Sequence, residues 1–140
     1  MSESAATRHC HAEIGGVRTF YREAGPSDAP AVLLPHGYPC SSYQYRRLRP
    51  ALGDRWRLLA PDFPGFGYSA TPSRDRFAFD FDGYAGFLER FADAQALDRY
   101  VLYLHDCGSQ IGLRLAIRPP ERVAALIIQN GDIYEDQLGP

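Results

Sequence analysis

Short apolar runs alternate with longer amphipathic stretches along this chain. Residues 81–96 carry apolar side chains at helical spacing, and 109–118 form a second helix-like run. Ser41 or Ser42 can cap another helix that extends to about Arg49, where Pro50 interrupts it. The remaining apolar runs are short and predict strands. These expected strands are 11–14, 17–23, 31–34, 57–60, 100–104 and 123–128.

This order of elements predicts an α/β fold, with residues 1–140 forming part of a single domain. The pair Gly15-Gly16 joins the first two strands in an antiparallel hairpin, and the later strands are expected to be parallel. The predicted sheet is therefore mostly parallel, with about six strands. Sites in such sheets lie at the carboxyl ends of the strands, so the segments after 31–34, 57–60 and 100–104 are expected to converge.

Composition narrows the possible functions. The net charge is −2 with both signs mixed, which argues against nucleic-acid binding. No apolar run approaches the roughly 20 residues of a membrane span. Residues 1–7 carry no apolar signal core, and the three scattered cysteines fit reduced thiols in the cytoplasm. His9 and His11 can share a strand face but lack a third ligand, so neither a metal nor another cofactor is expected.

Asp106 stands between the expected strand 100–104 and the following helix, which is the layout of a nucleophile elbow. Gly108 supplies a small residue for the sharp turn, whereas Leu104 occupies a position where elbows usually take a small residue and predicts a looser turn. Asp106 could instead merely cap the helix. Cys107 could be the nucleophile in a shifted frame, but His105 would then fill a position that favours a small side chain.

Three motifs in this order resemble those of the α/β-hydrolase superfamily, in the branch of epoxide hydrolases and haloalkane dehalogenases. They are His36 to Pro39 (H-G-x-P), Asp62 to Ser69 (D-x-x-G-x-G-x-S) and His105 to Gly108 (H-D-x-G). The segment from Arg118 to Val123 is similar to the family's link between the elbow helix and the next strand. The resemblance covers nearly the whole chain.

The resemblance implies a set of roles. Asp106 would be a nucleophile that forms an alkyl ester, and the backbone amides of Tyr38 and Cys107 would form the oxyanion hole. His36, Gly37, His105 and Gly108 would support the site. The family's catalytic histidine, acid and lid follow later, so the chain is expected to be the N-terminal half of the fold and inactive alone. Residues 132–140 would begin the connection to the lid.

The substrate implied by the resemblance is a small apolar epoxide or organohalide, with water as co-substrate. Dehalogenases often place an asparagine and a tryptophan where this chain has Tyr38 and Cys107, which favours the epoxide. Two alternatives stay open: a non-catalytic or vestigial relative that binds an apolar ligand, and a hydrolase of esters or carbon–carbon bonds. The last normally uses serine at the position of Asp106.

Overall fold

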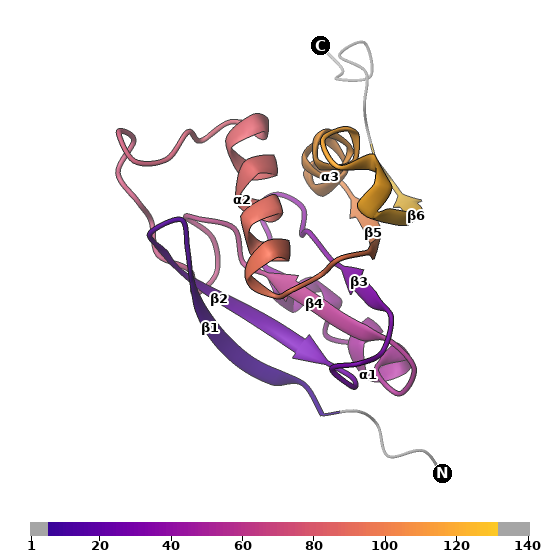
Figure 1. Cartoon of the computed structure of the whole chain (residues 1–140). Helices are drawn as coiled ribbons and strands as arrows, with labels where there is room; N and C mark the ends of the chain where they lie inside the picture. The colour runs from indigo at the N-terminus through magenta and orange to yellow at the C-terminus, as the bar shows by residue number, and fades with distance from the viewer. Residues whose placement is uncertain (1–5, 132–140) are drawn as a thin grey trace.

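A computed structural model describes residues 6–131 and shows a six-stranded sheet in the order β1-β2-β4-β3-β5-β6 (Figure 1). Residues 132–140, which were expected to begin the lid connection, lie outside the described residues. The strands are β1 (Arg8–Ile14), β2 (Val17–Ala24), β3 (Ala31–Leu33), β4 (Arg57–Pro61), β5 (Tyr100–His105) and β6 (Val123–Gln129).

The sheet has the predicted mixture of strand directions. β1 and β2 pair antiparallel up to Ile14 and Val17, and Gly15 and Gly16 between them both have positive φ angles, as a two-residue hairpin turn requires. β2 also runs antiparallel to β4, whereas β3 pairs parallel with β4 and β5, and β5 pairs parallel with β6. The expected fold class, a mostly parallel sheet with an N-terminal antiparallel hairpin, is confirmed.

The two long helices lie close to their predicted positions. α2 (Phe81–Ala94) begins after Asp80, whose carboxylate accepts a hydrogen bond from the backbone N–H of Gly83 at 2.7 Å. α3 (Cys107–Ile117) begins two residues earlier than the sequence indicated, directly after the turn at Asp106. A short 3₁₀ turn, η2 (Pro120–Arg122), then leads into β6.

The predicted helix from Ser41 to Arg49 is wrong in detail. The structure has a 3₁₀ turn, η1 (Ser42–Tyr45), capped by the Ser41 hydroxyl, followed by a separate helix, α1 (Leu48–Leu52). Pro50 lies inside α1 rather than at the end of a helix. It is the third residue of α1, where a backbone N–H has no partner within the helix, so proline loses no hydrogen bond there.

Alternate residues along the central strands point to opposite faces of the sheet. One face packs against α2 and α3, and the other packs against η1 and α1 (Figure 1). Leu33, Leu59 and Leu102 lie in the larger core with side chains of α2 and α3. Val32 and Leu58 lie in the smaller core. Burial of both faces explains why these strands read as continuous apolar runs.

β6 forms one edge of the sheet and keeps much of its apolar surface in solvent. Leu126, Ile127 and Ile128 are 42%, 46% and 52% exposed. An apolar edge strand of this kind is a template for further strand pairing. None of the helices within residues 6–131 is both long and apolar enough to cross a membrane.

Candidate active site

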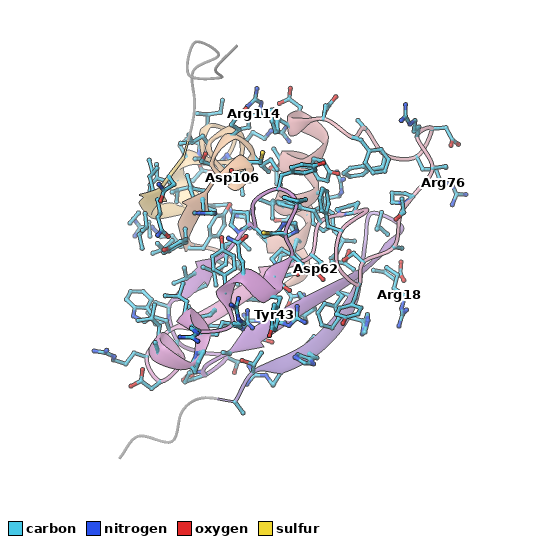
Figure 2. The ribbon with its side chains drawn as sticks, turned by 180° about the vertical axis from the view of Figure 1, so that it is seen from behind. Arg18, Tyr43, Asp62, Arg76, Asp106 and Arg114 are labelled. Atoms are coloured by element: carbon cyan, nitrogen blue, oxygen red, sulfur yellow. The ribbon has the colours of Figure 1, made fainter. Side chains whose placement is uncertain are left out.

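The turn between β5 and α3 is sharp. β5 ends at His105, α3 begins at Cys107, and Asp106 between them has φ 53° and ψ −134° (Figure 2). A non-glycine residue with this backbone is strained, and such strain concentrates at functional positions. The looser turn predicted from Leu104 is therefore not found. Leu104 is buried against Gly112 of α3. A Cβ atom at position 112 would lie 2.2 Å from Leu104 Cδ2, so the lack of a side chain there leaves space for Leu104.

Backbone amides hold the Asp106 carboxylate. The N–H of Tyr38 donates a hydrogen bond to Oδ1 at 2.9 Å. Hydrogen bonds from the backbone of Cys107 and of Tyr38 keep the pKa of Asp106 below its usual value. The carboxylate is therefore ionised at neutral pH. Beyond the contact with Cys107, the Asp106 side chain makes no N-cap hydrogen bond to α3, which is not what a residue that serves only as a helix cap would do.

Two glycines let the loop after β3 approach the turn at Asp106. A Cβ atom on Gly37 would lie 2.7 Å from the Cβ atom of Asp106. A Cβ atom on Gly108 would lie 2.6 Å from the backbone oxygen of Pro35. The hydrogen bond from Tyr38 to Asp106 depends on this close approach. The lack of a side chain at Gly37 and Gly108 permits this contact, and the supporting roles that the resemblance implied for them stay predictions.

We expect Gly37→Ala to lower the free energy of unfolding by about 1–3 kcal/mol, because the added methyl group overpacks the contact with Asp106. Urea denaturation measures the change. Gly86→Ala in α2 is the matched control, since its Cβ would meet only the flexible ends of Arg118 and Arg90, at 3.3 and 3.5 Å. Equal losses in the two variants would contradict the proposed close contact.

His36 fastens the same loop to the segment after β4. It is 1% exposed, and its Nε2 atom accepts a hydrogen bond from the backbone N–H of Phe63 at 3.1 Å. Nδ1 lies 2.8 Å from the backbone oxygen of Gly37 and must carry the proton to donate there. Burial lowers the pKa of His36, outweighing the opposing effects of Gly37 and Asp62. Both ring nitrogens of the neutral ring are thus engaged in holding the loop.

The stability of the protein is expected to depend on pH through His36. Because its pKa in the folded state lies below the ordinary 6.5, the unfolded state takes up the proton first. The free energy of unfolding should therefore fall as the pH drops below about 6.5, by at most about 1.4 kcal/mol per pH unit. Urea denaturation between pH 7.5 and 5.5 tests this. His36→Gln should lose this component, and an unchanged slope in that variant would refute it.

Gln44, in η1, links the loop to the end of β5 and was not singled out from the sequence. Its Oε1 atom accepts a hydrogen bond from the backbone N–H of Gly37 at 3.0 Å. Its Nε2 atom lies 3.4 Å from Nδ1 of His105, the neighbour of Asp106. A lone glutamine in a polar stretch carries no sequence signal of this kind. Gln44 reaches Gly37 and His105 because η1 packs against the loop after β3 and against the end of β5.

An apolar pocket of about 90 Å³ lies beside Asp106. Tyr38 and Cys107, the two residues whose amides face the carboxylate, both contribute to its wall. The remaining lining residues come from the loops after β3 and β4 and from α2 and α3: His36, Gly37, Phe63, Phe66, Phe81, Tyr84 and Ile111. The pocket therefore suits a small apolar group, and it reaches Asp106 through Tyr38 and Cys107, since Asp106 itself is not a lining residue.

The surroundings of Cys107 and of the pair His9 and His11 differ from those of Asp106. Cys107 is the first residue of α3 and does not occupy the strained turn. Burial, followed by the nearby Asp106, raises the pKa of its thiol, which disfavours a thiolate. His9 and His11 share a face, as expected, and both rings pack against Phe20. Within residues 6–131 no three potential ligands gather that could hold a metal ion.

Comparison with known proteins agrees with this geometry. An uncharacterized hydrolase from Saccharomyces cerevisiae is 38% identical over 138 residues, 99% of this chain and 47% of its own length. A haloalkane dehalogenase from Mycolicibacterium paratuberculosis is 38% identical over 116 residues, covering 82% of this chain and 38% of its own. The crystal structure of an epoxide hydrolase from Vigna radiata superposes with a TM-score of 0.78 at 27% identity, over 90% of this chain and 38% of that one.

The chain thus spans less than half the length of the relatives it matches. The family model described as the alpha/beta hydrolase fold matches residues 30–138. This range includes all three motifs that carried the resemblance, and with them the strained turn, the loop after β3 and the apolar pocket. The chain belongs to the α/β-hydrolase fold family.

Proposed function

We propose that this chain carries the nucleophile part of a hydrolase that opens a small apolar epoxide or organohalide through an alkyl ester on Asp106. The observation that carries the proposal is the hydrogen bond from the Tyr38 N–H to Asp106 Oδ1 at 2.9 Å. It fixes an ionised carboxylate at a strained turn beside an apolar pocket. The matches to a haloalkane dehalogenase and to an epoxide hydrolase support the same substrate classes.

The first chemical step follows from this arrangement. One carboxylate oxygen of Asp106 attacks an electrophilic carbon and forms a new carbon–oxygen bond. With an organohalide, the halide leaves with the electron pair of the broken bond. With an epoxide, the ring carbon–oxygen bond breaks, and its oxygen keeps the electron pair and takes up a proton from water. Neither Tyr38 nor Cys107 offers a side-chain N–H for a departing halide, which favours the epoxide.

The second step is hydrolysis of the ester. When water adds to the ester carbonyl, the backbone amides of Tyr38 and Cys107 would stabilise the oxyanion that develops. A histidine must activate that water. His36 engages both of its ring nitrogens elsewhere, and His9 and His11 pack on Phe20 in the hairpin. The fourth histidine, His105, precedes Asp106 at the end of β5, and its Nδ1 atom faces Gln44 at 3.4 Å. The 140-residue chain is therefore expected to form the ester and to hydrolyse it slowly.

Covalent capture tests the proposal with the chain as it is. The protein is incubated with 1,2-epoxyhexane or 1-bromohexane, and its intact mass is measured over time. The epoxide should add its whole mass, and the bromide should add a hexyl group in place of one hydrogen. Peptide mapping should place the adduct on Asp106 as a base-labile ester. Adducts confined to cysteines would overturn the proposal, and saturable binding without any adduct would favour a non-catalytic binding role.

A further inference from the structure

The outer face of the β1–β2 hairpin carries a second group of chemically active side chains. We call it the basic groove, and it is an open depression of about 360 Å³. It shares no lining residue with the pocket near Asp106, although the loop after β4 contributes to both. Its lining residues are His9, His11, Arg18, Phe20, Arg22 and Tyr68. The strand register places His9 opposite Arg22 and His11 opposite Phe20, so these side chains share one face of the hairpin.

Arg22 forms the floor of the basic groove. It is 7% exposed, and its Nη1 atom donates a hydrogen bond to the Ser42 hydroxyl at 2.6 Å. The guanidinium carbon lies 4.8 Å from the ring centroid of Phe20, 5.6 Å from that of Tyr43 and 5.9 Å from that of Tyr68. Aromatic faces stabilise a cation without neutralising its charge. Among residues 6–131, no carboxylate forms an ion pair with Arg22.

The buried charges behind the groove do not balance. Arg49, 3% exposed, donates a hydrogen bond to the Ser42 carbonyl at 2.8 Å, and the fully buried Asp62 accepts one from the Ser42 N–H at 2.7 Å. Two guanidinium groups and one carboxylate thus bind Ser42, and within residues 6–131 no ion pair joins Asp62 to Arg22 or Arg49. Burial, and then the neighbouring Arg22, lower the pKa of Arg49 to about 10. A buried excess of positive charge is costly unless an anion offsets it.

Residues at the rim of the basic groove add further positive or proton-donating groups. Arg18, His9 and His11 are exposed and reach the same depression. Glu13 lies opposite Arg18 in the hairpin register, but the two do not come within ion-pair distance in the described part of the chain. Figure 2 shows Arg18 on the hairpin side and Tyr43 on the η1 side, with Asp62 between them in that view.

We propose that the basic groove binds a small phosphate-like oxyanion. The Arg22 guanidinium at the floor and Arg18 at the rim would supply charge-assisted hydrogen bonds, with His9 and His11 as further donors. Phe20 and Tyr68 would form an apolar wall beside the anion, suited to an aromatic group attached to it. Such binding would offset the unbalanced charge of Arg22 and Arg49. The site is separate from Asp106, so this proposal does not rest on the proposed hydrolase activity.

Equilibrium titration with inorganic phosphate tests the proposal, at an ionic strength held constant with chloride. Arg18→Gln should weaken binding roughly tenfold, as expected for loss of a hydrogen bond between charged groups. Arg22→Gln should weaken it at least as much. Arg74→Gln, in an exposed loop outside the groove, is the matched control and should bind like the unchanged protein.

A second titration with phenyl phosphate distinguishes a free ion from an ion borne by an aromatic group. Tighter binding than inorganic phosphate would assign the wall of Phe20 and Tyr68 to the organic part, and equal binding would assign the groove to the free ion. Arg18 is exposed, so Arg18→Gln decides the outcome even where Arg22→Gln fails to fold. Absence of saturable binding, or equal binding by the Arg18→Gln and Arg74→Gln proteins, would overturn the proposal.

Discussion

Asp106→Asn should slow covalent capture of 1,2-epoxyhexane and 1-bromohexane by about 10⁴-fold or more, the scale on which loss of an essential nucleophile acts. The amide has nearly the same shape as the carboxylate, and its oxygen can still accept the hydrogen bond from Tyr38. It lacks the negative charge that attacks carbon. The rate at which the adduct appears in the intact-mass spectrum measures the effect.

The control for this experiment is Asp98→Asn, which changes an exposed carboxylate in the connection between α2 and β5. It should leave the capture rate unchanged. Urea denaturation should also show that Asp106→Asn remains folded. Capture at an unchanged rate in the Asp106→Asn protein would contradict the assignment of the nucleophile. It would leave membership of the family untouched, because that rests on the fold and on the whole matched segment.

Asp62→Asn should lower the free energy of unfolding by about 1–3 kcal/mol, the cost of leaving a buried hydrogen-bond donor without its acceptor. Asp62 is fully buried, and its two carboxylate oxygens accept hydrogen bonds from the backbone N–H groups of Ser42 and Tyr68, at 2.7 and 2.9 Å. Asparagine would point an NH₂ group at one of these donors. It would also remove the negative charge that favours the charged form of Arg49.

Urea denaturation at neutral pH measures this loss, with Asp98→Asn again as the control that removes an exposed carboxylate. A loss below about 1 kcal/mol would mean that Asp62 is no more than a turn residue. The space around it is also restricted, since a Cβ atom on Gly67 would lie 2.0 Å from Asp62 Oδ2. The turn after β4 is thus built around the carboxylate.

Much of the candidate site was visible in the sequence. A strand, an aspartate and a helix in succession predicted the turn at Asp106, and the motif from His36 to Pro39 predicted the loop that meets it. The amide of Tyr38 faces the carboxylate, where the resemblance had placed it. The roles of these residues in catalysis stay predictions until capture is measured. Gln44 and the charge group around Ser42 had no sequence signal, because each depends on contacts between distant segments.

The same contrast explains the errors in the predicted elements. Pro50 was predicted to end a helix, but the effect of a proline depends on its position within the helix. In the structure α1 begins only two residues before Pro50, where a proline is tolerated. Leu104 was expected to loosen the turn, but Gly112 one helical turn into α3 accommodates its side chain. Both outcomes depend on neighbours that a local pattern does not include.

Local patterns were enough to predict the order of strands and helices along the chain, the hairpin and the family, because apolar periodicity, turn residues and motifs act over short stretches of chain. The remaining features depend on contacts between segments that are distant in sequence. Pairing β3 with both β4 and β5 brings the loops after these strands to one edge of the sheet, where Tyr38 meets Asp106 across 68 positions of sequence. Packing η1 and α1 against β2 likewise buries Arg22 and Arg49 around Ser42. A local sequence pattern does not indicate this charge imbalance, because the charged residues come from segments that are distant in sequence.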